Sequence, residues 1–101
     1  MKYLLHGKLA AKENKTGELA SILLEAAALI ANAKGCHLYA ISKDANDASA
    51  VWVTEVWDTK EDHDNSLSVP GVRELISKAM PILEGAPQKG QELELLGGHG
   101  I

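Results

Sequence analysis

Hydrophobic side chains at the start of the chain follow two different periods. Residues 2–9 alternate loosely between apolar and polar side chains, which predicts a strand with one face buried. Leu4 breaks the alternation and indicates that the other face is also partly covered. In the next segment, apolar side chains recur at three- and four-residue intervals. This spacing predicts a helix that is capped by Asn14 or Thr16 and stopped by Gly35.

The middle of the chain has the residue types of a β-hairpin. Residues 36–42 and 50–57 are rich in β-branched and aromatic side chains, and the DANDAS loop between them is typical of a turn. Large apolar groups occur on both faces of the second strand, with Val53 and Trp57 on one face and Trp52 on the other. Since helices are expected to cover only one face of the sheet, the other face requires separate cover, such as a second subunit.

Two shorter helices are predicted after the hairpin. Asp58 followed by Glu61 has the form of a capping box, so a helix is expected to begin here. The turn at residues 69–71 interrupts it. An apolar stripe over residues 72–79 then predicts a second helix, which ends near Pro81.

The C-terminal part completes a βαββαβ order. Residues 86–90 are expected to form a loop and residues 91–96 a last strand, with Leu93 and Leu95 inward. The tail, residues 97–101, is expected to be flexible. This order predicts an α+β, ferredoxin-like sandwich with an antiparallel sheet and helices on one face, formed by all 101 residues as a single domain.

Charge and hydropathy exclude several classes of partner. The formal net charge is −4 and the lysines are scattered among acidic residues, so no basic face is available for nucleic acid. The longest apolar stretch, residues 19–33, is too short and too polar to span a membrane. The single Cys36 cannot form an internal disulfide, and the N-terminal segment lacks the apolar run of a signal peptide, so a cytoplasmic location is expected.

No pattern of metal ligands is present in the sequence. His6, His37 and His99 have no spacing that would bring them to His63, and Cys36 is beside only one of these histidines. Glycine-rich phosphate loops and Ser-His-Asp motifs are also missing. We therefore expect no bound metal.

A short set of motifs resembles a known family: Gly35-Cys36, Tyr39, Glu55-Val56-Trp57 and Pro70. The antibiotic biosynthesis monooxygenase family has Gly-Cys-x-x-Tyr, a short loop, Glu-x-Trp, a helix and a Ser-Pro-like turn in this region. The similarity is best over residues 35–83. It implies a dimeric α+β barrel, in which the sheets of a homodimer pack face to face.

The resemblance also implies a class of activity. Characterised members include oxygenases that oxidise phenolic, anthrone-like or quinol substrates without metal or flavin, related haem-degrading enzymes, and isomerases. Ser66 stands where the family commonly has a His, and Ile76 where the haem-degrading branch has its axial His. The resemblance thus implies a cofactor-independent monooxygenase acting on a small aromatic or quinol-type substrate. The alternatives are a non-catalytic module that binds a small ligand or responds to stress, and a proton-shuttling isomerase on the same fold.

The candidate site consists of one base and three wall residues. His63 shares a helix face with Ser66, and an imidazole against an apolar pocket could take a proton from a phenol or enol. Tyr39 and Trp57 could wall a pocket for a planar ligand together with Ser66, with Tyr39 donating a hydrogen bond. Each role has a structural alternative, because His63 could lie in a solvated acidic run and both aromatic residues could be core.

Glu55 is the one carboxylate expected on a buried strand face. It could accept a proton, or it could form a salt bridge with a lysine or with Arg73. We favour the structural role, because the same residue recurs in relatives of different activities.

Overall fold

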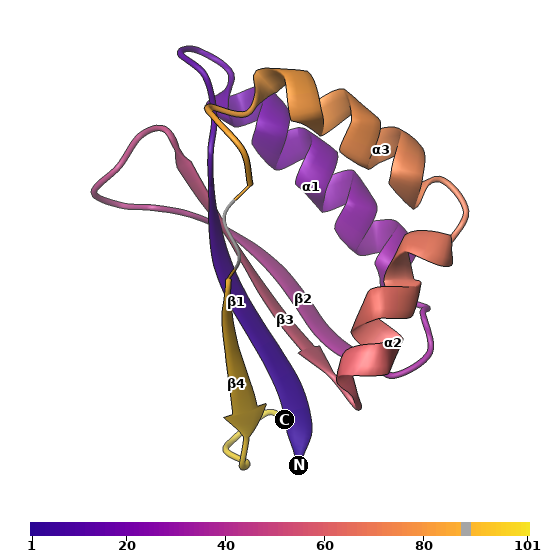
Figure 1. Ribbon diagram of the computed structural model, residues 1–101. Helices are drawn as coiled ribbons and strands as arrows, with labels where there is room; N and C mark the ends of the chain where they lie inside the picture. Colours follow the sequence, from indigo (N-terminus) through magenta and orange to yellow (C-terminus); the bar gives the residue numbers. More distant parts are fainter. Residues whose placement is uncertain (88–89) are drawn as a thin grey trace.

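The computed structural model describes residues 1–87 and 90–101, and its helices cover one face of a four-stranded sheet (Figure 1). The elements are β1 (Lys2–Ala10), α1 (Thr16–Ile30), β2 (Cys36–Lys43), β3 (Ala50–Trp57), α2 (Lys60–Asn65), η1 (Ser66–Ser68), α3 (Val72–Ala79), η2 (Met80–Ile82) and β4 (Gln91–Leu95). The βαββαβ order and the ferredoxin-like α+β fold predicted from the sequence are confirmed.

The sheet has the strand order β2-β3-β1-β4, and every neighbouring pair is antiparallel. In the register, Tyr3 lies opposite Trp57, and Tyr39 lies opposite Glu55. Residues that pair across an antiparallel ladder have their side chains on the same face. These four side chains therefore share the face that the helices cover.

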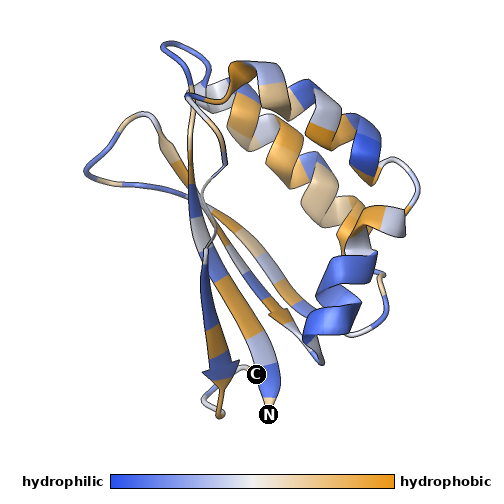
Figure 2. Ribbon diagram, viewed as in Figure 1, coloured by the Kyte–Doolittle hydropathy of each residue, from blue (hydrophilic) through white to orange (hydrophobic). Residues whose placement is uncertain are grey.

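The helices α1 and α3 lie side by side over this face (Figure 1), and hydrophobic residues occur along both of them (Figure 2). The buried ones are Leu19, Ala26 and Ile30 of α1 and Val72, Leu75 and Ala79 of α3. The core consists of two clusters, one around Leu19 and Val51 and the other around Ile30 and Trp57. Leu19 and Ile30 are near opposite ends of α1, just as Val51 and Trp57 are near opposite ends of β3. The core is therefore divided between the two ends of the sandwich.

The termini of α1 differ from the prediction. Neither Asn14 nor Thr16 caps the helix, because its N-cap is Lys15, which makes no side-chain capping bond. Asn14 instead has a φ of 64° and turns the chain into the helix. The helix also ends at Ile30, short of Gly35, because a tight turn follows in which the Ala33 amide donates to the Ile30 carbonyl.

The start of α2 also differs from the prediction. The N-cap is Thr59 and not Asp58, since the Thr59 side chain accepts a hydrogen bond from the Asp62 amide at 3.1 Å. The Asp58 carboxylate instead lies 2.6 Å from Nε2 of His37. The interruption expected at residues 69–71 is present, between η1 and α3.

The last strand ends at Leu95, and its apolar side chains lie on the opposite face from the one predicted. Leu93 pairs with Leu4, and Leu95 pairs with Lys2, so both leucines lie on the face of the sheet that no helix covers. The expectation that Leu93 and Leu95 point into the core of the chain is therefore wrong.

Part of the loop expected at 86–90 lies outside the described residues, and the flexibility expected of residues 97–101 stays a prediction. Within the described ranges, no helix is long and apolar enough to cross a membrane.

Candidate functional site

A cavity of about 550 Å³ lies between the sheet and the helix layer. Its walls come from β1, α1, β2, β3, α2, α3 and the turns that flank α3. The polar side chains among its described lining residues are Tyr39, Glu55, His63, Asp64 and Ser66, and the other side chains are apolar. This volume and this distribution are typical of a site for a small organic molecule.

Glu55 is the carboxylate deep in the polar part of the cavity. Its side chain is only 9% exposed. Trp57 Nε1 donates a hydrogen bond to Glu55 Oε1 at 3.0 Å, and Nε2 of His63 lies 3.6 Å from the same oxygen. Burial raises the pKa of Glu55, and the Trp57 hydrogen bond and His63 lower it by a smaller amount. The result is a fixed proton acceptor in an apolar setting.

His63 lies between two carboxylates. Its Nε2 faces Glu55, and its Nδ1 is 3.0 Å from Oδ1 of Asp64. The imidazole also packs against Tyr3, with ring centroids 5.5 Å apart, and against the edge of Trp57, at 6.1 Å. Its side chain is 25% exposed, so the ring is oriented into the cavity wall although the surrounding EDHD run is polar. An imidazole in this position can pass a proton between the interior and the surface.

Tyr39 and Ser66 line the same cavity as His63, whereas Trp57 does not. Burial is the main cause that raises the pKa of Tyr39, and Glu55 adds to it, so the phenol stays protonated and can donate a hydrogen bond. Ser66 is buried in the cavity wall at the start of η1. Trp57 is fully buried behind Glu55, which places it as a support for that carboxylate.

The structure brings Glu55 into the site, although the sequence argument favoured a structural role for it. Its neighbours are Trp57 and His63, and Arg73 instead donates to the Leu67 carbonyl at 3.3 Å. One feature of the sequence pointed to this position. A carboxylate that alternates with Val53 and Trp57 on a buried strand face must have a specific partner.

The apolar wall ends in three partly exposed side chains, Leu67, Ile76 and Met80. Ile76 lines the cavity with an aliphatic side chain and so cannot coordinate a haem iron. In the described part of the chain, no cluster of His, Cys, Asp or Glu side chains is arranged to hold a metal ion.

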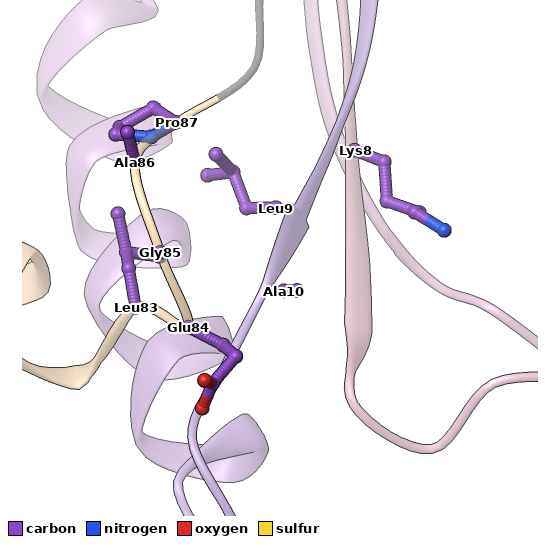
Figure 3. A pocket seen from close by; sticks show the side chains of 8 residues that line it. All are labelled: Lys8, Leu9, Ala10, Leu83, Glu84, Gly85, Ala86 and Pro87. Atoms are coloured by element: carbon purple, nitrogen blue, oxygen red, sulfur yellow. The ribbon is translucent and has the colours of Figure 1, made fainter.

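A second, smaller cavity of about 50 Å³ lies between β1 and the segment that follows η2 (Figure 3). Leu9 points from β1 toward Ala86 and Pro87, while Lys8 points away on the other side of the strand (Figure 3). Leu9, Leu83 and Pro87 line both cavities, so the small one lies directly behind a wall of the large one. It has room for little more than a water molecule.

The family model for antibiotic biosynthesis monooxygenases matches residues 3–78, which include the polar end of the cavity. The chain belongs to this family. A candidate antibiotic biosynthesis monooxygenase from Chloroflexus aurantiacus J-10-fl is 38% identical, over 100% of this chain and 99% of that one, with a TM-score of 0.88. No curated protein matches the sequence.

Two solved structures at lower identity share the fold. A candidate antibiotic biosynthesis monooxygenase from Nitrosomonas europaea is 16% identical, and the match covers 94% of this chain and 90% of that one, with a TM-score of 0.86. SnoaB from Streptomyces nogalater, a cofactor-independent oxygenase, is 11% identical and covers 97% of this chain and 96% of its own, with a TM-score of 0.78. At these identities the likeness extends to the fold alone.

Proposed function

We propose that this chain is a cofactor-independent monooxygenase that oxidises a small aromatic, quinol-type substrate with O₂. The observation that carries the proposal is an apolar cavity with one polar end, where His63 lies 3.6 Å from the buried Glu55. Membership of a monooxygenase family supports the reaction class. The same cavity would have to bind the substrate, deprotonate it and exclude water from the intermediates.

In the proposed reaction, Nε2 of His63 takes a proton from a substrate hydroxyl while Tyr39 donates a hydrogen bond to a substrate oxygen. The electron-rich anion gives one electron to O₂, and the resulting substrate radical and superoxide combine to form a C–O bond. The peroxide takes back a proton, and cleavage of its O–O bond with loss of the ring C–H proton releases water. One oxygen atom enters the product, which is a hydroxyquinone if the substrate is a quinol, and the substrate itself is the reductant.

The proposed wall of the site consists of Ser66, on the same side of the cavity as His63, and the aliphatic side chains of α1 and α3. Trp57 acts through Glu55, because it fixes the carboxylate with a hydrogen bond and has no surface of its own in the cavity. Apolar walls keep water away from the radical and peroxide intermediates.

We also propose that the active form is a homodimer. The face of the sheet opposite the helices exposes 39% of Leu38 and 50% of Leu93, and Leu4 pairs with Leu93 on that face. Contiguous apolar surface on a sheet is a common site of association. Since side chains alternate between faces, this contact would leave the cavity between sheet and helices free.

The decisive experiment is oxygen consumption by metal-stripped protein with a panel of quinols, naphthols and anthrones. His63→Ala is run beside wild type, with His99→Ala, an exposed residue outside the cavity, as the control. Saturable uptake that His63→Ala abolishes and His99→Ala leaves intact supports the proposal. If oxygen uptake stays at the uncatalysed background while the ligand still binds, the chain is a binding module and not a monooxygenase. If the ligand is isomerised without O₂, the chain is an isomerase.

A further inference from the structure

We propose that Glu55 makes the cavity selective for neutral ligands that bear a hydroxyl group, and that it excludes ligands that bear a carboxylate. The inference rests on the proposed function only in taking this cavity as the substrate site. It concerns which molecules enter, and it holds whether or not they are oxidised there.

The charges at the polar end of the cavity are the first argument. Glu55 and Asp64 both line it, and no Lys or Arg is present among its described lining residues. The Glu55 side chain is 9% exposed, so water screens its charge poorly. A ligand carboxylate at this end would approach two like charges, with only His63 between them as a potential cation.

Hydrogen bonding is the second argument. Above its folded-state pKa, Glu55 is an ionised carboxylate that only accepts hydrogen bonds, and each of its oxygen atoms can accept more than one. Trp57 uses part of this capacity at Oε1, and it fixes the carboxylate so that the remaining acceptor positions are held ready for a ligand. A ligand hydroxyl can donate to such a group, whereas a ligand carboxylate can only accept hydrogen bonds, for which the lining offers Tyr39, Ser66 and the imidazole of His63.

The apolar walls determine what kind of molecule can carry the hydroxyl group. Away from Tyr39, Glu55, His63, Asp64 and Ser66, the described lining side chains are all apolar, and the cavity measures about 550 Å³. A bicyclic or tricyclic aromatic with its hydroxyl at one edge matches this arrangement, with the hydroxyl against Glu55 and the rings between the sheet and the helices.

Binding of a matched ligand pair tests the inference. 2-Naphthol and 2-naphthoate share one ring system, and at neutral pH the first is neutral and the second is an anion. Calorimetric titration of wild type should give naphthol a dissociation constant at least about tenfold below that of naphthoate, the size of a screened like-charge contact. Glu55→Gln keeps an acceptor for Trp57 and removes the charge, so it should bring the two constants within about threefold by tightening naphthoate.

Two controls complete the design. Glu94→Gln removes an exposed carboxylate on the same face of the sheet that does not line the cavity, and it should leave the ratio unchanged. The methyl ester of 2-naphthoic acid removes the charge from the ligand instead, so it should bind wild type like the naphthol. The titration of wild type with the methyl ester tests the inference even if Glu55→Gln fails to fold.

Equal binding of naphthol and naphthoate to wild type would overturn the inference, and so would an unchanged ratio in Glu55→Gln or no binding of any of the three ligands. Selective binding of naphthol without oxygen uptake has a different meaning. It would remove the monooxygenase proposal and leave the selectivity of Glu55 in place.

Discussion

Trp57 donates a hydrogen bond to Glu55 from a position two residues further along the same strand, with 3.0 Å between the indole nitrogen and the carboxylate oxygen. Alternate residues of a strand share a face, so both side chains lie under the helices. The indole belongs to the core and the carboxylate belongs to the cavity wall. Core packing and the geometry of the candidate site therefore depend on one contact.

Trp57→Phe should lower the free energy of unfolding by about 2–4 kcal/mol, because it leaves a cavity in the core and removes a donor from a buried carboxylate. Urea unfolding followed by circular dichroism measures the change. The matched control is Trp52→Phe, because Trp52 is only partly buried and its Nε1 donates at 3.0 Å to Asp44, which is also only partly buried. Equal losses in the two variants would contradict the role given to Trp57.

Glu55 should make the protein less stable as the pH rises. Burial raises its pKa in the folded state above the unfolded value, so the folded state binds more protons between the two values. The stability that this group contributes is complete below the unfolded pKa and is lost as the pH rises through the folded pKa. Urea unfolding at several values between about pH 4 and pH 8 should show this loss in wild type and not in Glu55→Gln, after the slope common to both is subtracted. Identical slopes would show that Glu55 titrates normally.

Leu93→Glu should convert the proposed dimer into a monomer. The substitution places a charge on the open face of the sheet, beside Leu4, where a second sheet would bury it. Multi-angle light scattering should give the mass of a single chain for this variant and twice that mass for wild type. Leu24→Glu is the control, because Leu24 is 57% exposed on α1, on the helix side of the molecule. A monomeric wild type would refute the dimer.

Gly35→Ala should destabilise the fold by about 1–2 kcal/mol, since Gly35 has a φ of 80°, which L residues adopt at a cost. The added methyl group would also collide with the Asp62 carboxylate in the first turn of α2. Gly17→Ala makes a sharp comparison. Gly17 lies in the first turn of α1 with open space around it, so alanine there should stabilise the protein by up to about 1 kcal/mol. The two melting temperatures should shift in opposite directions.

Local patterns were sufficient to predict the elements of this fold. The alternation along β3 assigned Val53, Glu55 and Trp57 to one face, and the register confirms that assignment. Capping was predicted less well, because Asp58 pairs with His37 from β2 and leaves the N-cap to Thr59. The residue that decides between Asp58 and Thr59 as the N-cap is His37, which lies 21 residues away from Asp58 in the chain.

The direction of the side chains of β4 shows a different limit of prediction from local patterns. Alternation established that Leu93 and Leu95 share a face, but the direction of that face depends on how the edge strand pairs with β1. For the site, helical spacing predicted that His63 and Ser66 share a face, and both line the cavity although Ser66 belongs to η1. The importance of Glu55 could not be seen locally, because its burial and its contact with His63 arise only when α2 folds back over β3.

The single-layer sheet has a consequence for how this protein can be changed. Odd-numbered positions of β3 from Val51 to Trp57 are directed to the helices and the cavity, and even-numbered positions from Trp52 to Val56 are directed to the open face. On the first face Glu55 lines the cavity, so its substitution would alter ligand preference, whereas substitutions on the second face would alter the association of the proposed dimer. Seven consecutive codons thus alternate between the two faces, which selection, or a combinatorial library, can vary separately.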